Sequence, residues 1–171
     1  MIGKSGNLGR WVPLNKGGEF RKWYGNNEFV IDWGENGVSI KNYAGAVIRN
    51  ESYYFKESIT WNDITSYKVS FRFKEAGEIF NDAGPSIFAS HDTLMDLIAF
   101  GNTKIMQEIC YFIAPTIHYT VGQISNAPIA TVSNMETRKA IEKLAEDCIS
   151  ISRSDWDSFE TSWDFKRHPL V

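Results

Sequence analysis

Cysteine and histidine are scarce in this chain of 171 residues, and several classes of site are excluded as a result. The two cysteines, Cys110 and Cys148, form no disulfide framework, and the three histidines are too far apart in sequence to present two ring nitrogens to one zinc ion. No stretch reaches the roughly 20 apolar residues of a membrane span, and the first residues lack a charged-then-apolar leader. We therefore expect a reduced, cytoplasmic protein with no metal site and no membrane partner.

Catalytic motifs are also missing. Gly3-Lys4-Ser5 matches only the end of a phosphate-binding loop, because two residues precede it where that loop needs a strand and a further glycine. The five prolines are isolated from one another, which excludes the Pro-Pro-aromatic tetrapeptide of DNA amino-methyltransferases. A serine nucleophile elbow is absent as well. We expect no catalytic residue and no bound cofactor in this chain.

Positive charge is concentrated in the first half of the chain. The formal net charge is −3, but residues 1–85 hold 11 Lys and Arg against 10 Asp and Glu, whereas residues 86–171 hold 7 against 11. A chain with this gradient can present one basic face to phosphate while its total charge stays negative. Charge that is simply scattered for solubility explains the same counts, so the gradient alone does not identify a partner.

Two kinds of periodicity predict an α+β fold. Short β-rich runs separated by turn residues predict a mostly antiparallel sheet at about 28–90 and at 116–121. Apolar residues at helical spacing predict helices at about 92–114, 134–150 and 154–165. The last two helices lead us to divide the chain into an α+β domain, residues 1–130, and a helical appendage or spacer, residues 131–171.

Local signals set the ends of several elements. A turn at Gly34–Gly37 is expected to join strands at 29–33 and 38–40, and residues 123–128 are expected to form a loop. Gly101 and Pro115 are expected to end two helices, with Asn102 or Thr103 as the cap between them. A capping box at Ser133 begins the later helical part.

Residues 67–73 alternate cleanly between apolar and polar, as in a strand with one face exposed. One face of this predicted strand carries Tyr67, Val69, Phe71 and Phe73. The other carries Lys68, Ser70 and Arg72, which we expect to point into solvent as a polar stripe.

Several segments, taken together and in order, resemble one family. They are GGEFRKWYGN (17–26), VIDW (30–33), YFKESITW (54–61), FNDAGPSIF (80–88), the 94–104 region, APT (114–116), GQI (122–124), API (127–129) and WDSFETSWDF (156–165). The set resembles the C-terminal target-recognition region of PglX-type adenine-specific DNA methyltransferases of BREX phage-defence systems. It is more distantly similar to the recognition domains of type IIG restriction-modification enzymes and type I specificity subunits. A helix-Asn-Ser-Lys-helix unit of those domains corresponds here to Asn102-Thr103-Lys104.

The resemblance implies that this chain is a fragment that reads DNA and performs no chemistry. The intact parent would transfer a methyl group from S-adenosylmethionine to the N6 of adenine, with the methyl donor held in a preceding domain. The implied partners are double-stranded DNA, the catalytic methyltransferase domain of the same parent chain and other defence-system proteins. A second hypothesis is a protein–protein interaction module that docks on the catalytic domain or on other defence-system subunits, since aromatic residues are enriched at such interfaces.

DNA recognition needs cations for phosphate and polar side chains for base edges. The candidates for phosphate or guanine are Arg21, Lys22, Arg49, Lys56, Lys68 and Arg72. The candidates for contact with sugar or a displaced base are Trp23, Tyr24 and Trp61. Those for base edges are Asn26, Asn27, Thr60, Asn62 and Ser66, and Ser70 is a further DNA-binding candidate in the polar stripe. Solvation of a strand surface explains an exposed cation equally well, and core packing explains a tryptophan or tyrosine beside a glycine.

Overall fold

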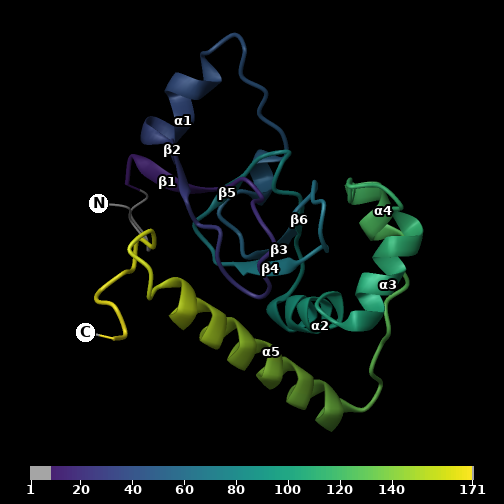
Figure 1. The fold of residues 1–171 in the computed structure, drawn as a ribbon. Helices are drawn as coiled ribbons and strands as arrows, with labels where there is room; N and C mark the ends of the chain where they lie inside the picture. Colours follow the sequence, from purple (N-terminus) through teal and green to yellow (C-terminus); the bar gives the residue numbers. More distant parts are fainter. Residues whose placement is uncertain (1–8, 171) are drawn as a thin grey trace.

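The computed structural model describes residues 9–170, in which two small sheets and five α-helices form an α+β fold (Figure 1). The fold class expected from the sequence is confirmed. None of the described helices is both long enough and apolar enough to cross a membrane. The motif Gly3-Lys4-Ser5 lies outside the described residues.

The first sheet has the strand order β2-β1-β5. Strand β1 (Trp11–Asn15) lies between β2 (Phe29–Asp32), which is antiparallel to it, and β5 (Ile79–Phe80), which is parallel. Val12, Trp33 and Ile79 form a small hydrophobic core at this sheet.

Helix α1 (Gly34–Lys41) follows β2, where the sequence predicted a turn and then a strand. The turn is present, because Glu35, Asn36 and Gly37 are all left-handed, with φ of 51°, 59° and 73°. The strand at 38–40 is wrong, since the chain continues there as one helical turn. At Gly37 a Cβ atom would lie 3.0 Å from the Trp33 indole, so only glycine lets the turn close over that ring.

The second sheet has the order β4-β3-β6, and all of its pairs are antiparallel. After a short 3-10 turn (Glu51–Tyr53), β3 (Ser58–Trp61) forms the centre, flanked by β4 (Phe71–Lys74) and β6 (Ser86–Ile87). Its apolar face carries Ile59, Trp61, Phe71 and Phe73, which belong to the main hydrophobic core.

Helices cover this apolar face. Helix α2 (His91–Gly101) buries Leu94, Met95 and Ile98 in the main core, and α5 (Met135–Trp156) runs beside α2 (Figure 1). Helix α3 (Lys104–Ile113) begins where Thr103 Oγ1 accepts a hydrogen bond from the Met106 amide at 3.1 Å. Helix α4 (Val121–Ser125) begins with a capping box between Thr120 and Gln123.

Three further expectations about the second half of the chain are wrong. The strand at 116–121 is reduced to a single bridge between Ile64 and His118, and part of the loop expected at 123–128 is helix α4. The helices expected at 134–150 and 154–165 are instead one helix that ends at Trp156 and is followed by turns. Trp156 is buried in the main core, so packing keeps the helix continuous through residues 150–154, where the sequence predicted a break.

The division between residues 1–130 and 131–171 stays a prediction. Helix α5 contributes Ala145, Ile149 and Trp156 to the same core as β3 and β4. Arg138 on α5 also forms an ion pair of 2.7 Å with Asp96 on α2.

Candidate nucleic-acid interface

The second face of the β3–β4 sheet is polar, and it is buried. Ser58, Thr60, Ser70, Arg72 and Lys74 on this face are all less than 6% exposed, and we call them the polar layer. The alternation in sequence is therefore real, but the expectation that Ser70 and Arg72 form an outward stripe with Lys68 is wrong. The glycine-rich segment 16–27 covers this face, so only Lys68, which precedes the strand, is exposed.

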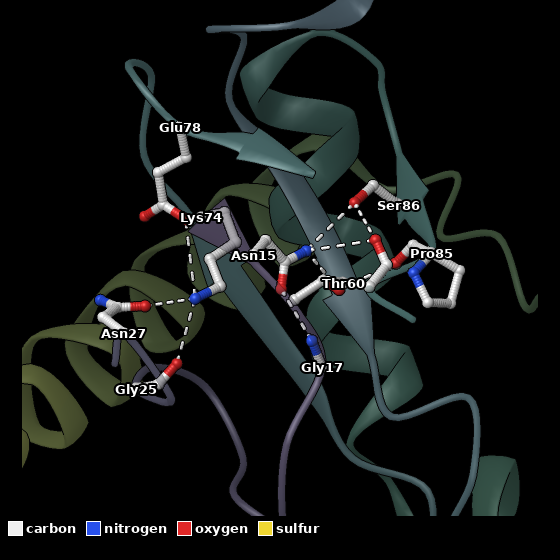
Figure 2. A network of polar contacts seen from close by, with 10 residues as sticks. Asn15, Gly17, Gly25, Asn27, Thr60, Lys74, Glu78, Pro85 and Ser86 are labelled. Atoms are coloured by element: carbon white, nitrogen blue, oxygen red, sulfur yellow. Dashed lines mark hydrogen bonds and ion pairs between the residues drawn. The ribbon is translucent and has the colours of Figure 1, made fainter. Parts of the chain in front are cut away.

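Asn15 anchors the covering segment to the polar layer (Figure 2). Its Nδ2 donates to Thr60 Oγ1 at 2.8 Å and to the Gly84 carbonyl at 3.3 Å, while its Oδ1 accepts from the Gly17 amide at 3.4 Å. Gly17 has φ +77°, and a Cβ there would lie 2.4 Å from the Ala83 carbonyl oxygen. The covering segment thus starts from a fixed position that requires glycine.

Lys74 fixes the other end of the covering segment. Its Nζ donates to the Gly25 carbonyl at 3.2 Å, donates to Asn27 Oδ1, and forms an ion pair of 3.7 Å with Glu78 (Figure 2). Burial lowers the pKa of Lys74. Because its donors are used by the covering segment and it is buried, Lys74 has a structural role here.

Arg72 is the most isolated cation of the polar layer. Its Nη1 donates to Ser70 Oγ at 3.1 Å and to the Arg21 carbonyl at 3.2 Å, whereas its Nε and Nη2 have no hydrogen-bond partner among residues 9–170. Burial, and then the charge of Arg21, lowers the pKa of Arg72 to about 10. With no exposed surface, Arg72 cannot reach DNA in this conformation.

Arg21 carries its side chain from the covering segment to α5. Its Nε donates to the Tyr24 carbonyl at 3.0 Å, its Nη2 forms an ion pair of 2.5 Å with Asp155, and its guanidinium lies 5.1 Å from the Trp156 ring centroid. One quarter of the side chain is exposed. Arg21 therefore helps to hold α5 in place and keeps limited access to solvent.

Lys22 and Lys68 come together from two distant parts of the chain. Lys22 Nζ donates to the Asn102 carbonyl at 2.7 Å. Burial, and then the charge of Lys68, lowers the pKa of Lys22. The two like charges repel one another, and an anion placed beside both would relieve that repulsion.

Two exposed aromatic residues adjoin these lysines in sequence. The rings of Phe20 and Tyr67 meet edge to face, with centroids 5.0 Å apart and an interplanar angle of 89°. Phe20 is 39% exposed and Tyr67 is 65% exposed. We refer to Phe20, Lys22, Tyr67 and Lys68 as the cationic surface, because flat apolar rings next to lysines suit contact with nucleotides.

The other predicted DNA-binding residues do not all join the cationic surface. Tyr24, Thr60 and Trp61 are buried, and the Trp61 indole donates to the Tyr119 carbonyl at 2.7 Å. Asn26 donates to the Glu19 carbonyl at 2.9 Å, and Trp23 is partly buried against the main core. Arg49 is exposed and Lys56 lies over the Tyr53 ring; both adjoin residues that pack on the small core, such as Ile48 and Phe55.

Sequence reasoning missed Phe20 and Tyr67 as members of a surface. Tyr67 was assigned to the apolar face of a strand, but β4 begins only at Phe71. A basic residue follows each of the two aromatic residues closely, at Lys22 and Lys68, and that pattern is the signal that could have identified them. Within residues 9–170, no cluster of His, Cys, Asp and Glu side chains is arranged to hold a metal ion.

No protein-family model matches the chain, but two curated relatives align with almost all of it. The adenine-specific methyltransferase PglX of Lacticaseibacillus casei (strain Zhang) is 38% identical over 169 residues, a match that covers 94% of this chain and 14% of the relative. The adenine-specific methyltransferase BrxX of Escherichia coli O9:H4 (strain HS) is 32% identical over 166 residues, with 95% and 13% covered. The chain is homologous to a segment of these methyltransferases.

The predicted resemblance to PglX-type methyltransferases is thereby confirmed. The matched part takes in nearly the whole fold described above. The chain spans only 13–14% of the length of PglX and BrxX, so most of each methyltransferase lies outside the matched segment.

Proposed function

We propose that this chain is a DNA-binding target-recognition domain of an adenine-specific methyltransferase from a BREX or related phage-defence or restriction-modification system. By resemblance, the intact parent transfers a methyl group to the N6 of adenine in the cytoplasm. S-adenosylmethionine is then bound by a part of the parent that lies outside residues 1–171. The recognition domain itself contributes binding and no catalytic residue.

The observation that carries this proposal is the convergence of Lys22 and Lys68 beside an exposed aromatic pair. The two lysines are more than 40 residues apart in sequence, and the contact between the Phe20 and Tyr67 rings, 5.0 Å apart, brings their two segments together. Neither lysine has a carboxylate partner among the described ion pairs, which leaves both charges available for phosphate. Phe20 and Tyr67 supply flat surfaces for a sugar or an exposed base.

The covering segment gives this surface a fixed shape. Asn15 and Lys74 hold the segment at its two ends, and the Trp23 amide donates to the Phe71 carbonyl at 2.8 Å in its middle. A rigid element positions recognition side chains better than a free loop does, because less side-chain and backbone entropy is lost on binding. We assign phosphate contact to Lys22 and Lys68, with Arg21 as a further cation at the edge of the same segment.

The proposed partners follow from this assignment. Double-stranded DNA contacts the cationic surface, and the catalytic methyltransferase domain of the same parent chain contacts another face of the domain. Other proteins of the defence system are proposed partners of the intact parent. Arg49 and Lys56, which lie on the part of the chain that packs on the small core, are also proposed to contact DNA.

Salt dependence tests the proposal directly. If Lys22 and Lys68 each neutralise a phosphate, and Arg21 adds a third when it exchanges Asp155 for DNA, the affinity of the 171-residue chain for a fluorescent duplex should fall about 10-fold (two contacts) to 40-fold (three) between about 50 and 200 mM salt. Titration of duplex into the chain, followed by fluorescence anisotropy at several salt concentrations, measures the slope. A duplex affinity that does not change with salt would reject phosphate contact.

In cells that make the intact parent, sequencing of methylated adenines with and without the Lys22 and Lys68 substitutions then reports on target recognition.

A further inference from the structure

An apolar groove lies between α2, α5 and the segment 129–132 that precedes α5. It encloses about 570 Å³, and its walls carry Leu97, Phe100, Ile141, Leu144, Cys148 and Trp23. The ion pair between Asp96 and Arg138 also lines it. We refer to it as the α2–α5 groove.

Helix α5 has two apolar sides, but only one of them packs on the main hydrophobic core. Ala145, Ile149 and Trp156 face the main core, whereas Leu144 is 63% exposed and Ile151 is 71% exposed. Leu144, Cys148 and Ile151 are spaced by four and three residues, so they form one stripe along the helix. A continuous exposed apolar stripe beside a groove is typical of a surface that another polypeptide segment covers.

The relatives indicate where such a segment comes from. The matched part makes up 13–14% of PglX and BrxX, so a parent of similar length has most of its chain available to cover the groove. A segment of the same polypeptide is held near the groove at a high effective concentration. Such a segment fills the groove without needing a high affinity as a separate peptide.

The groove also lies next to the cationic surface. Trp23 lines the groove, and its neighbour Lys22 belongs to the cationic surface. A segment seated in the groove therefore lies beside the DNA that the cationic surface would bind. The catalytic part of the parent must act on that same duplex, so a segment of the catalytic part is a suitable occupant of the groove.

We propose that the α2–α5 groove is the docking site for an apolar segment of the parent polypeptide outside residues 1–171, which fixes the catalytic part of the parent beside the bound DNA. The choice of occupant rests on the proposed function. The residues that hold the segment are Leu144 and Cys148 on α5 and Leu97 and Phe100 on α2.

Cys148 offers a direct readout of the groove. It lines the groove and is partly exposed, whereas Cys110 is buried in the main core. In the 171-residue chain, a maleimide should label Cys148 readily and Cys110 slowly. In the full-length parent, peptide mapping by mass spectrometry should show Cys148 labelled at least about tenfold more slowly, because the occupant excludes the reagent from the groove.

A matched pair of variants tests the cause of that protection. Leu144→Asp places a carboxylate in the groove, and in the full-length parent it should return Cys148 labelling to the rate of the 171-residue chain and lower adenine methylation in cells by tenfold or more. Ser150→Asp places the same charge on α5 at an exposed position outside the groove lining, and it should change neither. Thermal unfolding of both variants of the 171-residue chain checks that each still folds.

Three results would overturn the proposal. The first is equal Cys148 labelling in the chain and in the full-length parent. The second is labelling of the 171-residue chain that slows with its own concentration, with a dimer in sedimentation, since a second copy would then be the occupant. The third is a small apolar ligand in native mass spectrometry of the full-length parent.

Leu144→Asp should leave the duplex affinity of the 171-residue chain unchanged, so a failure of the docking site and a failure of DNA binding give different results.

Discussion

Reversing the charges of Lys22 and Lys68 together, as Lys22→Glu with Lys68→Glu, should lower the duplex affinity of the chain about 100-fold at low salt. Each reversal removes one cation from a phosphate and puts an anion in its place, and a loss of about 1.4 kcal/mol at each position multiplies the Kd tenfold. The slope of the logarithm of affinity against the logarithm of salt should become shallower by about two. Fluorescence anisotropy across a salt series measures both effects.

The controls for this variant come from the same chain. Lys139→Glu with Lys143→Glu makes the same change of charge at two exposed positions on α5, and it should lower the affinity far less. Lys68→Glu alone alters an exposed side chain, so a tenfold loss there cannot come from unfolding. If the α5 pair weakens duplex binding as much as the Lys22 and Lys68 pair does, the chain senses only net charge and the assigned surface is wrong.

The elements that could be predicted from the sequence are those with complete local signals. Gly101 and Pro115 bracket α3, and Thr103 provides the cap that the sequence indicates, so the boundary between α2 and α3 was found. Strand β3 lies inside the region, about 28–90, in which β-rich runs predict a sheet. In these cases the residues that decide the structure lie within a few positions of the element itself.

The candidate site was harder to predict because its accessibility depends on distant contacts. Alternation correctly separates Phe71 and Phe73 from Ser70 and Arg72, but it does not reveal what covers each face. Segment 16–27 covers the polar face through contacts such as that between the Arg21 carbonyl and Arg72. A strand with one polar face is normally exposed on that face, and this exception follows from packing between parts of the chain about 50 residues apart.

The same argument explains why Lys68 is exposed and Lys22 partly exposed while Arg72 is buried. Arg72 lies inside β4, where both faces are covered, whereas Lys68 precedes the strand and Lys22 lies in the covering segment. Composition showed that cations are concentrated in the first half of the chain. Only the three-dimensional structure shows which of these cations stabilise the fold and which face solvent.

Asn102→Ala should lower the free energy of unfolding by about 2–4 kcal/mol, because the Asn102 amide takes the place of a neighbouring strand. Its Nδ2 donates to the Phe71 carbonyl at 2.9 Å and its Oδ1 accepts from the Phe71 amide at 3.2 Å. Asn102 is buried, so alanine leaves the Phe71 amide unpaired and removes one of the bonds to its carbonyl. Urea denaturation followed by tryptophan fluorescence measures the change.

Asn126→Ala is the matched control. Asn126 is exposed and its Nδ2 bonds only the Gly122 carbonyl, at 2.7 Å, so its loss should cost about 1 kcal/mol or less. Equal losses at the two positions would show that Asn102 does not support β4. The expected difference gives the Asn-Thr-Lys unit between α2 and α3 a physical role. Thr103 caps the start of α3, and the Asn102 side chain ties the end of α2 to β4. The Asn102 carbonyl also accepts the hydrogen bond that holds Lys22 at the cationic surface.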